Sequence, residues 1–179
     1  MLKRLVLALL VAACNQVYAE QPGRFGFGHS PSAAEIKQWD TDITPDGRQL
    51  PAGTGTADRG REIYQAKCLS CHGDAGQGGS NDRLVGKYDA HINFARDTQV
   101  VRTIGNYWPY ATTLYDYINR AMPFTTPGTL TPDEVYSLVA YLLYLNGIIN
   151  HDTEMSAVSL PQVVMPARQL FYWSDEVNQ

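Results

Sequence analysis

The chain has 179 residues and is 44% hydrophobic, which is enough for one domain with extensions and a buried core. Its formal net charge is −4 at pH 7, and its sequence contains no basic patch interleaved with aromatic residues. This composition argues against a nucleic-acid-binding protein.

The N-terminal segment has the pattern of an export signal. Lys3 and Arg4 form a positively charged start, residues 5–13 are apolar, and the stretch ending at Ala19 fits the small-x-small cleavage rule. The apolar run is too short to span a bilayer. We therefore predict that residues 1–19 are a signal peptide and that the mature protein is periplasmic.

A second interpretation of this segment stays open. The sequence VAAC, which ends at Cys14, resembles a bacterial lipobox, in which the cysteine is lipidated and becomes the first mature residue. Cleavage after Ala19 is favoured because the residues before that bond fit the small-x-small rule well. The protein is membrane-anchored only if Cys14 is lipidated, and in both cases the mature fold relies on just two cysteines, Cys68 and Cys71.

Residues 20–55 are rich in glycine and proline and are predicted to form an N-terminal arm, ordered at least in part. One short helix is expected in it, because Ser32 and Glu35 have the spacing of a capping box ahead of IKQW. Thr56 can cap the next helix, through ADRGREIYQAKC, which leads directly into CLSCHG.

Two cysteines three positions apart, followed at once by a histidine, allow several interpretations. A structural zinc site needs four ligands, usually in two pairs, and no second C-x-x-C and no H-x-x-x-H occurs in the sequence. A thioredoxin-like pair would open a helix rather than follow one, and it leaves His72 unexplained. A disulfide across two intervening residues would constrain little chain entropy.

Attachment of c-type haem accounts for all three residues. In C-x-x-C-H, Cys68 and Cys71 form thioethers with the haem vinyl groups, and His72 presents its imidazole to the iron. Export agrees with this interpretation, because haem is attached outside the cytoplasm. We predict one covalently attached haem c.

Iron at an electron-transfer site normally has six ligands, so one further ligand is expected. Met122 is favoured, because Pro123 cannot continue a helix and leaves an extended chain that suits a thioether pointing into a pocket. Met165 also precedes a proline but lies in the tail, and His91 would give bis-histidine ligation. The remaining candidates are Met155, His29 and His151.

Residues 112–122, TTLYDYINRAM, have apolar positions at helical spacing and are predicted to be helical. Upstream of them, Tyr107, Trp108 and Tyr110 are candidates to line a haem pocket or to bind the haem propionates, with core packing as the alternative.

The last helix has the strongest signals. Thr131 and Glu134 form a capping box with Pro132 at the first helical position, and Asn146-Gly147 ends the helix. No alternating strand pattern occurs, so the predicted fold class is all-α. The haem domain is expected over residues 56–150, with a C-terminal extension over 151–179.

The stretch GREIYQAKCLSCHG is similar to the first helix and haem motif of class I c-type cytochromes. Further positions match the helix crossing of that family and the methionine that closes its haem pocket. They are Gly60, Tyr64, Leu138, Tyr141 and Met122. The resemblance covers roughly residues 56–147 and implies a class I cytochrome c fold, with His72 as the proximal and Met122 as the distal iron ligand.

Longer stretches, among them GNYWPYATTLYDYINRAMPF and SLPQVVMPARQLF, look like the monohaem cytochrome subunit of bacterial sulfite dehydrogenases and the related subunit of sulfane dehydrogenase. In that family the cytochrome partners a molybdopterin-containing subunit, where sulfite is oxidised, and electrons leave singly through the haem. The resemblance implies an electron-transfer subunit without a catalytic site of its own. It would belong to a heterodimer or larger complex and would reduce a soluble cytochrome c or another acceptor.

Two other functions remain open. A free-standing periplasmic electron carrier would need no dedicated partner, but such a carrier does not require long extensions on both sides of its haem domain. A haem enzyme with an open distal site would need a distal acid–base pair, and none is visible in the sequence.

Overall fold

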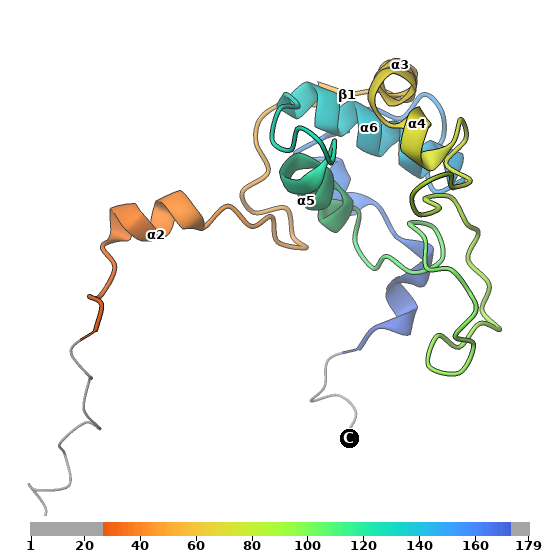
Figure 1. The fold of residues 1–179 in the computed structure, drawn as a ribbon, viewed down its shortest axis with the longest axis horizontal. Helices are drawn as coiled ribbons and strands as arrows, with labels where there is room; N and C mark the ends of the chain where they lie inside the picture. The colour runs from red at the N-terminus through yellow and green to blue at the C-terminus, as the bar shows by residue number, and fades with distance from the viewer. Residues whose placement is uncertain (1–26, 173–179) are drawn as a thin grey trace, which may run out of the picture. The chain divides into compact units, whose positions relative to one another are not determined.

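The computed structural model describes residues 27–172 (Figure 1). The predicted signal peptide 1–19, with Cys14, lies outside the described residues. The chain divides into two compact units after Asp40. Within the described residues, no helix is long and apolar enough to cross a membrane.

The N-terminal unit contains helix α2 (Ala33–Trp39). The Ser32 side chain accepts a hydrogen bond from the Glu35 backbone amide, and the Glu35 carboxylate accepts one from the Ser32 amide, so the predicted capping box is confirmed. No residue of α2 is buried. Its large apolar side chains, Ile36 and Trp39, are 51% and 84% exposed.

The second unit is helical, as the sequence predicts. Its helices are α3 (Ala57–Lys67), α4 (Leu69–His72), α5 (Ala111–Ala121) and α6 (Pro132–Leu145). Local signals set the ends of these helices: Thr56 caps α3, and a capping box at Thr131 with Pro132 begins α6. Asn146 caps the end of α6, and Gly147 follows with a φ of +69°, a conformation that glycine adopts without strain.

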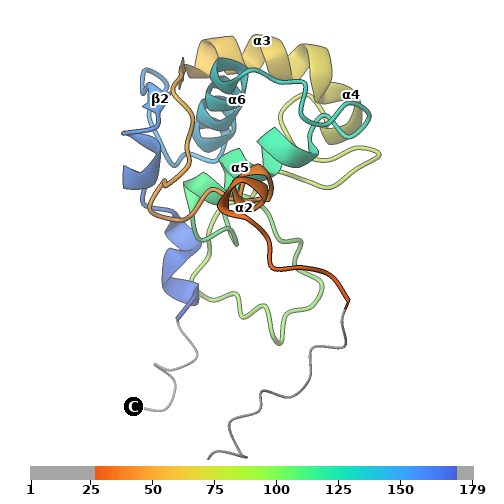
Figure 2. The same cartoon turned by 90° about the vertical axis from the view of Figure 1, so that its left-hand side faces the viewer.

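Helices α3 and α6 cross and pack against each other (Figures 1 and 2). Gly60 of α3 lies against the backbone carbonyl of Ser137 in α6, and a Cβ atom added at Gly60 would overlap that oxygen. Next to this contact, the rings of Tyr64 and Tyr141 pack with centroids 5.4 Å apart. The predicted pairing of these two helices through Gly60 and Tyr64 is therefore present.

Residues 41–55 pack against the helices of this unit. The Ile43 amide donates to the Asp116 carboxylate, and the Tyr136 hydroxyl donates to the Pro51 carbonyl. Strand β1 (Thr54–Gly55) then pairs antiparallel with β2 (Met155–Ser156) from the other end of the chain. The sequence does not predict these strands, because two residues are too few to produce an alternating pattern.

The tail is anchored on the same unit. After β2 it forms two short 3₁₀ helices, η1 (Leu160–Gln162) and η2 (Pro166–Leu170). Four of its side chains are buried in the core: Met155, Leu160, Met165 and Ala167. The described part of the C-terminal extension therefore stabilises the helical unit rather than projecting from it.

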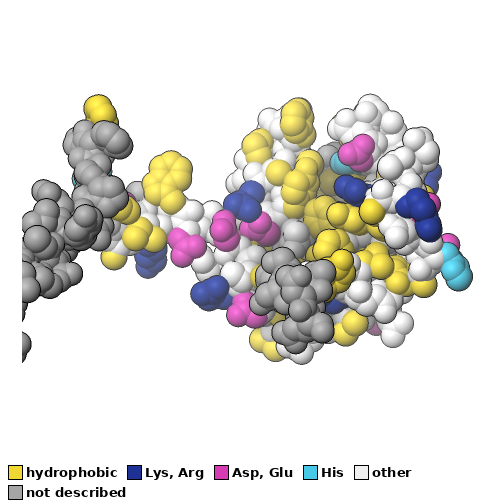
Figure 3. Space-filling view, turned by 90° about the horizontal axis from the view of Figure 1, so that it is seen from below, with side chains coloured by type: hydrophobic (Ala, Val, Ile, Leu, Met, Phe, Trp, Pro, Cys, Tyr) yellow, Lys and Arg dark blue, Asp and Glu magenta, His cyan; other side chains and the backbone are white. Residues whose placement is uncertain are grey.

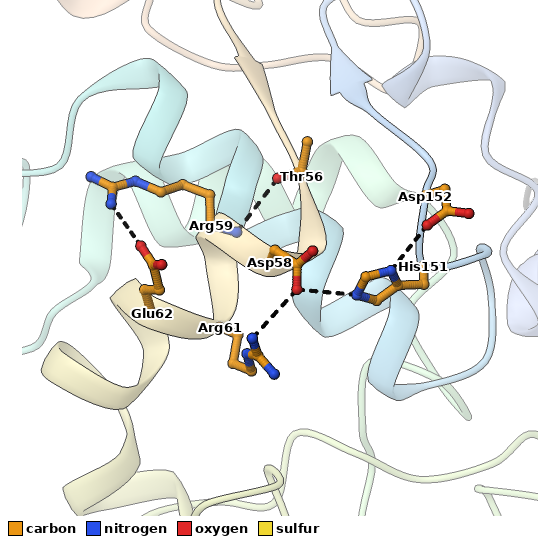
Figure 4. Close-up of polar contacts among 7 residues, drawn as sticks. All are labelled: Thr56, Asp58, Arg59, Arg61, Glu62, His151 and Asp152. Atoms are coloured by element: carbon orange, nitrogen blue, oxygen red, sulfur yellow. Dashed lines mark hydrogen bonds and ion pairs between the residues drawn. The ribbon is translucent and has the colours of Figure 1, made fainter.

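A polar contact joins the start of this tail to α3 (Figure 4). His151 lies between Asp58, whose Oδ1 is 3.2 Å from Nε2, and Asp152, whose Oδ1 is 3.1 Å from Nδ1. The hydrogen bond to Asp152 and the charge of Asp58 raise the pKa of His151 above its usual value. Asp58 also pairs with Arg61 at 3.5 Å, so the carboxylate links the tail to the first turns of α3.

Candidate functional site

The four residues predicted to bind haem line one pocket in the helical unit. The pocket has a volume of about 510 Å³ and is enclosed by α3, α4, α5, α6 and the loops between them. Cys68, Cys71, His72 and Met122 all contribute to its wall. In Figure 3, hydrophobic side chains gather on the face shown, and charged side chains lie around them.

The two cysteines are placed by the junction of α3 and α4. Cys68 ends α3 and begins α4, and its carbonyl accepts hydrogen bonds from the amides of Cys71 and His72. Both sulfurs are half-buried, and the two cysteines do not form a disulfide with each other. Burial raises the pKa of the Cys68 thiol to about 11 before haem is attached, because the sulfur faces an apolar pocket.

The imidazole of His72 is oriented by a backbone carbonyl. Its Nδ1 lies 2.8 Å from the Asp82 carbonyl oxygen and must be the donor, because a carbonyl can only accept. The adjacent Asn81 amide donates to the Cys71 carbonyl, which ties the Asp82 segment to α4. In the neutral imidazole this tautomer makes Nε2 the acceptor nitrogen, which is the one available as a metal ligand.

Met122 lines the pocket from the C-terminal end of α5. It caps α5 with an extended backbone, φ −123° and ψ 149°, as expected for a residue before proline. Its amide still donates to the Ile118 carbonyl, which fixes the residue to the end of α5. A half-buried thioether thus faces the same pocket as the histidine and the two thiols.

The other candidate ligands do not line this pocket. Met155 and Met165 are buried in the tail, where they belong to the apolar core. His29 pairs with Glu35 in the N-terminal unit, His91 is exposed, and His151 pairs with Asp58 and Asp152. Among the described methionines and histidines, only His72 and Met122 line the pocket.

The aromatic candidates divide between the pocket and its surroundings. Trp108 lines the pocket and packs edge-on against Tyr117, which also lines it. Tyr107 instead contacts Phe94 and Phe171, and Tyr110 lies under Arg168. Sequence reasoning could not separate these three neighbours, because they stand in a loop without periodicity.

Most of the pocket wall was not assigned to the site from the sequence. Its apolar part is made by Leu84, Ile104, Leu114, Ile118, Leu130, Leu138 and Leu142, and its basic residues are Lys67, Arg83 and Arg102. The helical members follow from the spacing of α5 and α6, but the loop members carry no signal of their own. Apolar walls with a few polar groups are typical of cofactor sites.

These residues fit covalently bound haem. Two thiols on one helical turn suit two thioether bonds, and an imidazole and a thioether suit the two axial positions of the iron. The apolar wall suits the flat faces of a porphyrin, and the basic residues suit its carboxylates. The fold and this set of groups define a class I c-type cytochrome.

Comparison with known proteins agrees with that class. Residues 55–142 match the family model described as cytochrome c oxidase, cbb3-type, subunit III. A chain in the crystal structure of the sulfane dehydrogenase SoxCD from Paracoccus pantotrophus is 38% identical, with a TM-score of 0.72; the match covers 86% of this chain and 74% of that one. The chain belongs to the class I c-type cytochromes, and its cofactor is covalently attached haem c.

A second relative is named for a reaction of a sulfur compound. Thiosulfate dehydrogenase of Psychrobacter arcticus is 28% identical over 119 residues, which is 66% of this chain. The match covers 32% of that relative, so the chain spans about a third of its length. The predicted resemblance to cytochromes of sulfur oxidation is confirmed at the level of the family.

Proposed function

We propose that the chain is a periplasmic monohaem cytochrome that carries single electrons from a molybdopterin-containing sulfite or sulfane dehydrogenase subunit to a downstream acceptor. The observation that carries the proposal is the convergence of Cys68, Cys71, His72 and Met122 on one apolar pocket. Residues 56–150 would be the haem domain, between a mature arm that follows the signal 1–19 and an extension over 151–179. The similarity to a chain of a sulfane dehydrogenase supports the choice of electron source.

In this proposal each side chain has a separate task. Cys68 and Cys71 would hold the haem through thioether bonds, and His72 and Met122 would be the proximal and distal iron ligands. Bound haem would supply a one-electron couple, and a thioether ligand would favour its reduced form relative to a second histidine. The Asp82 carbonyl keeps the Nδ1 proton on His72, and the apolar wall excludes water from the site.

The N-terminal unit offers a surface for the dehydrogenase subunit. Phe27, Ile36 and Trp39 are 92%, 51% and 84% exposed, although α2 is capped at its start like a stable helix. Large apolar side chains that stay exposed close to one another are typical of binding surfaces. We therefore place part of the interface with the molybdenum subunit on this arm.

The test is purification of the tagged protein from its own host, followed by addition of sulfite or a sulfane-sulfur donor while haem reduction is recorded. A molybdenum protein in the eluate and rapid reduction by one of the donors are expected. Trp39→Ala should reduce the recovered partner several-fold while leaving the haem spectrum unchanged. Lys37→Ala, an exposed change on the same helix, is the control and should retain the partner.

Each contrary result would contradict a different part of the proposed function. Absence of a partner and of reduction by either donor would leave a free-standing electron carrier. Equal recovery with Trp39→Ala and Lys37→Ala would remove the arm from the interface. Haem reduction that requires no partner subunit would favour a haem enzyme.

Cys68→Ser should leave haem attached through one thioether at most. The serine hydroxyl cannot form the thioether, so the protein should lose its double attachment and accumulate less haem. Pyridine haemochrome spectra, which shift when a vinyl group remains unsaturated, and haem staining on denaturing gels provide the measurement. A spectrum identical to that of the wild type would contradict attachment through Cys68.

A further inference from the structure

The C-terminal extension reaches Arg102, a residue of the pocket wall, through aromatic contacts. Phe171, just after η2, packs edge-on against Tyr107 with ring centroids 5.3 Å apart. Tyr107 packs in turn against Phe94 at 4.9 Å. The guanidinium carbon of Arg102 lies over both rings, 4.7 Å from the centroid of Tyr107 and 5.8 Å from that of Phe94.

Arg102 differs from the other cations of the pocket wall. Lys67 pairs with Glu134 at 3.4 Å, and the Arg83 Nε donates to the Gln77 carbonyl at 3.3 Å. Arg102 lines the same pocket, and within residues 27–172 its guanidinium forms no ion pair and no hydrogen bond. All five of its N–H donors are thus available for an anion.

The backbone on both sides of Arg102 is fixed. The buried Asn106 side chain accepts from the Thr103 amide at 2.7 Å and donates to the Val101 carbonyl at 3.0 Å. The Thr103 hydroxyl donates to the Gly86 carbonyl at 3.2 Å. A side chain on such a turn, stacked on two rings, loses little further freedom when it binds a ligand.

We propose that Arg102 binds a propionate carboxylate of the haem and that the C-terminal extension holds Arg102 in place through Phe171 and Tyr107. Arginine forms paired hydrogen bonds with a carboxylate and also stacks on aromatic faces, so one side chain can do both. The proposal rests on haem occupying this pocket, as in the proposed function. Arg102 and Phe171 would then set the reduction potential together, the second as a positioning residue.

The test is spectroelectrochemical titration of the purified holoprotein between pH 5 and 9. Arg102→Gln should lower the reduction potential, because a cation beside the haem favours the reduced form, which carries one positive charge less. The propionate ionisation seen in the curve of potential against pH should move up by about one to three pH units. Arg102→Lys should show smaller shifts of both quantities than Arg102→Gln. Lysine keeps the positive charge but lacks the planar guanidinium that forms paired hydrogen bonds with a carboxylate.

Phe171→Ala should shift the potential in the same direction by a smaller amount. The controls are Arg96→Gln, which removes an exposed arginine outside the pocket wall, and Tyr172→Ala, which removes the exposed ring next to Phe171. Both controls should match the wild type. The Arg102 and Phe171 variants keep every other charged or titratable group near Arg102, so those groups contribute equally to each titration curve. In the pocket wall these groups are His72, Tyr64, Tyr117, Lys67, Asp82 and Arg83. In the segments packed nearby they are Tyr88, Arg96, Asp97, Tyr107 and Arg168.

Two results would overturn the proposal. If Arg102→Gln has the same potential and pH curve as Arg96→Gln, the propionate does not bind Arg102. If Arg102→Gln shifts the potential but Phe171→Ala matches Tyr172→Ala, the extension does not position the arginine. Haem content and the methionine–iron band of each variant are recorded on the same samples. A failure of haem binding itself would therefore be distinguished from both results.

Discussion

Met122→Ala is expected to abolish the ferric methionine–iron absorption band and to lower the reduction potential. The thioether of Met122 lines the pocket that also contains His72, and alanine provides no donor in its place. A soft sulfur ligand favours ferrous iron, so its loss favours the oxidised state. The expected change is a sizeable part of the roughly 0.8 V range over which axial ligands set haem potentials. Ferric absorption spectra and spectroelectrochemical titration measure the two effects.

Met165→Leu is the matched control for that experiment. Met165 is also followed by a proline, but it is 2% exposed in the core of the tail and does not line the pocket. A methionine-to-leucine exchange nearly conserves volume and should cost less than about 1.5 kcal/mol of stability. The absorption band should remain in this variant. A band that survived in Met122→Ala and disappeared in Met165→Leu would assign the iron ligand to the tail instead.

The parts of the fold that the sequence predicts best are encoded by neighbouring residues. The caps at Ser32, Thr56 and Thr131 each depend on a side chain and an amide three positions away, so the starts of three helices were predictable. The haem motif is equally local, because Cys68, Cys71 and His72 share one helical turn. A following proline does not single out Met122, because Met165 has one too, but the position of Met122 ahead of the last helix does, and Met122 lines the same pocket.

The parts that the sequence does not reveal depend on distant segments or on backbone groups. The hydrogen bond that orients His72 comes from the Asp82 carbonyl, and any residue at that position could provide it. The pairing of β1 with β2 joins opposite ends of the helical unit through two residues each. Arg102 reaches the pocket from a loop, where no periodicity indicates which side chains face inward.

The crossing of α3 and α6 is indicated in part by the sequence and is explained in full only by the structure. Gly60 is conspicuous in the sequence as a glycine inside a predicted helix, but only the structure shows what fills the space beside it. A Cβ atom at this position would overlap the Ser137 carbonyl oxygen and would lie 2.7 Å from the Cβ of Tyr141. These are backbone or backbone-proximal atoms, which cannot rotate away as the end of a flexible side chain could. An added methyl group must therefore move α3 away from α6.

Gly60→Ala is expected to destabilise the holoprotein by about 2 kcal/mol. Overpacking typically costs about 1–3 kcal/mol, and a contact with backbone should cost about 3 kcal/mol, from which the gain of about 1 kcal/mol in helix propensity is subtracted. Guanidinium chloride unfolding, followed by far-UV circular dichroism, provides the free energy. Ala66→Gly, at an exposed position of α3, measures the propensity difference in the same helix. Because α3 leads directly into Cys68, the displaced helix should also lower the yield of haem-loaded protein. Unchanged or higher stability of Gly60→Ala would mean that the two backbones are not in close contact in solution, and the crossing would then not be what positions the haem motif.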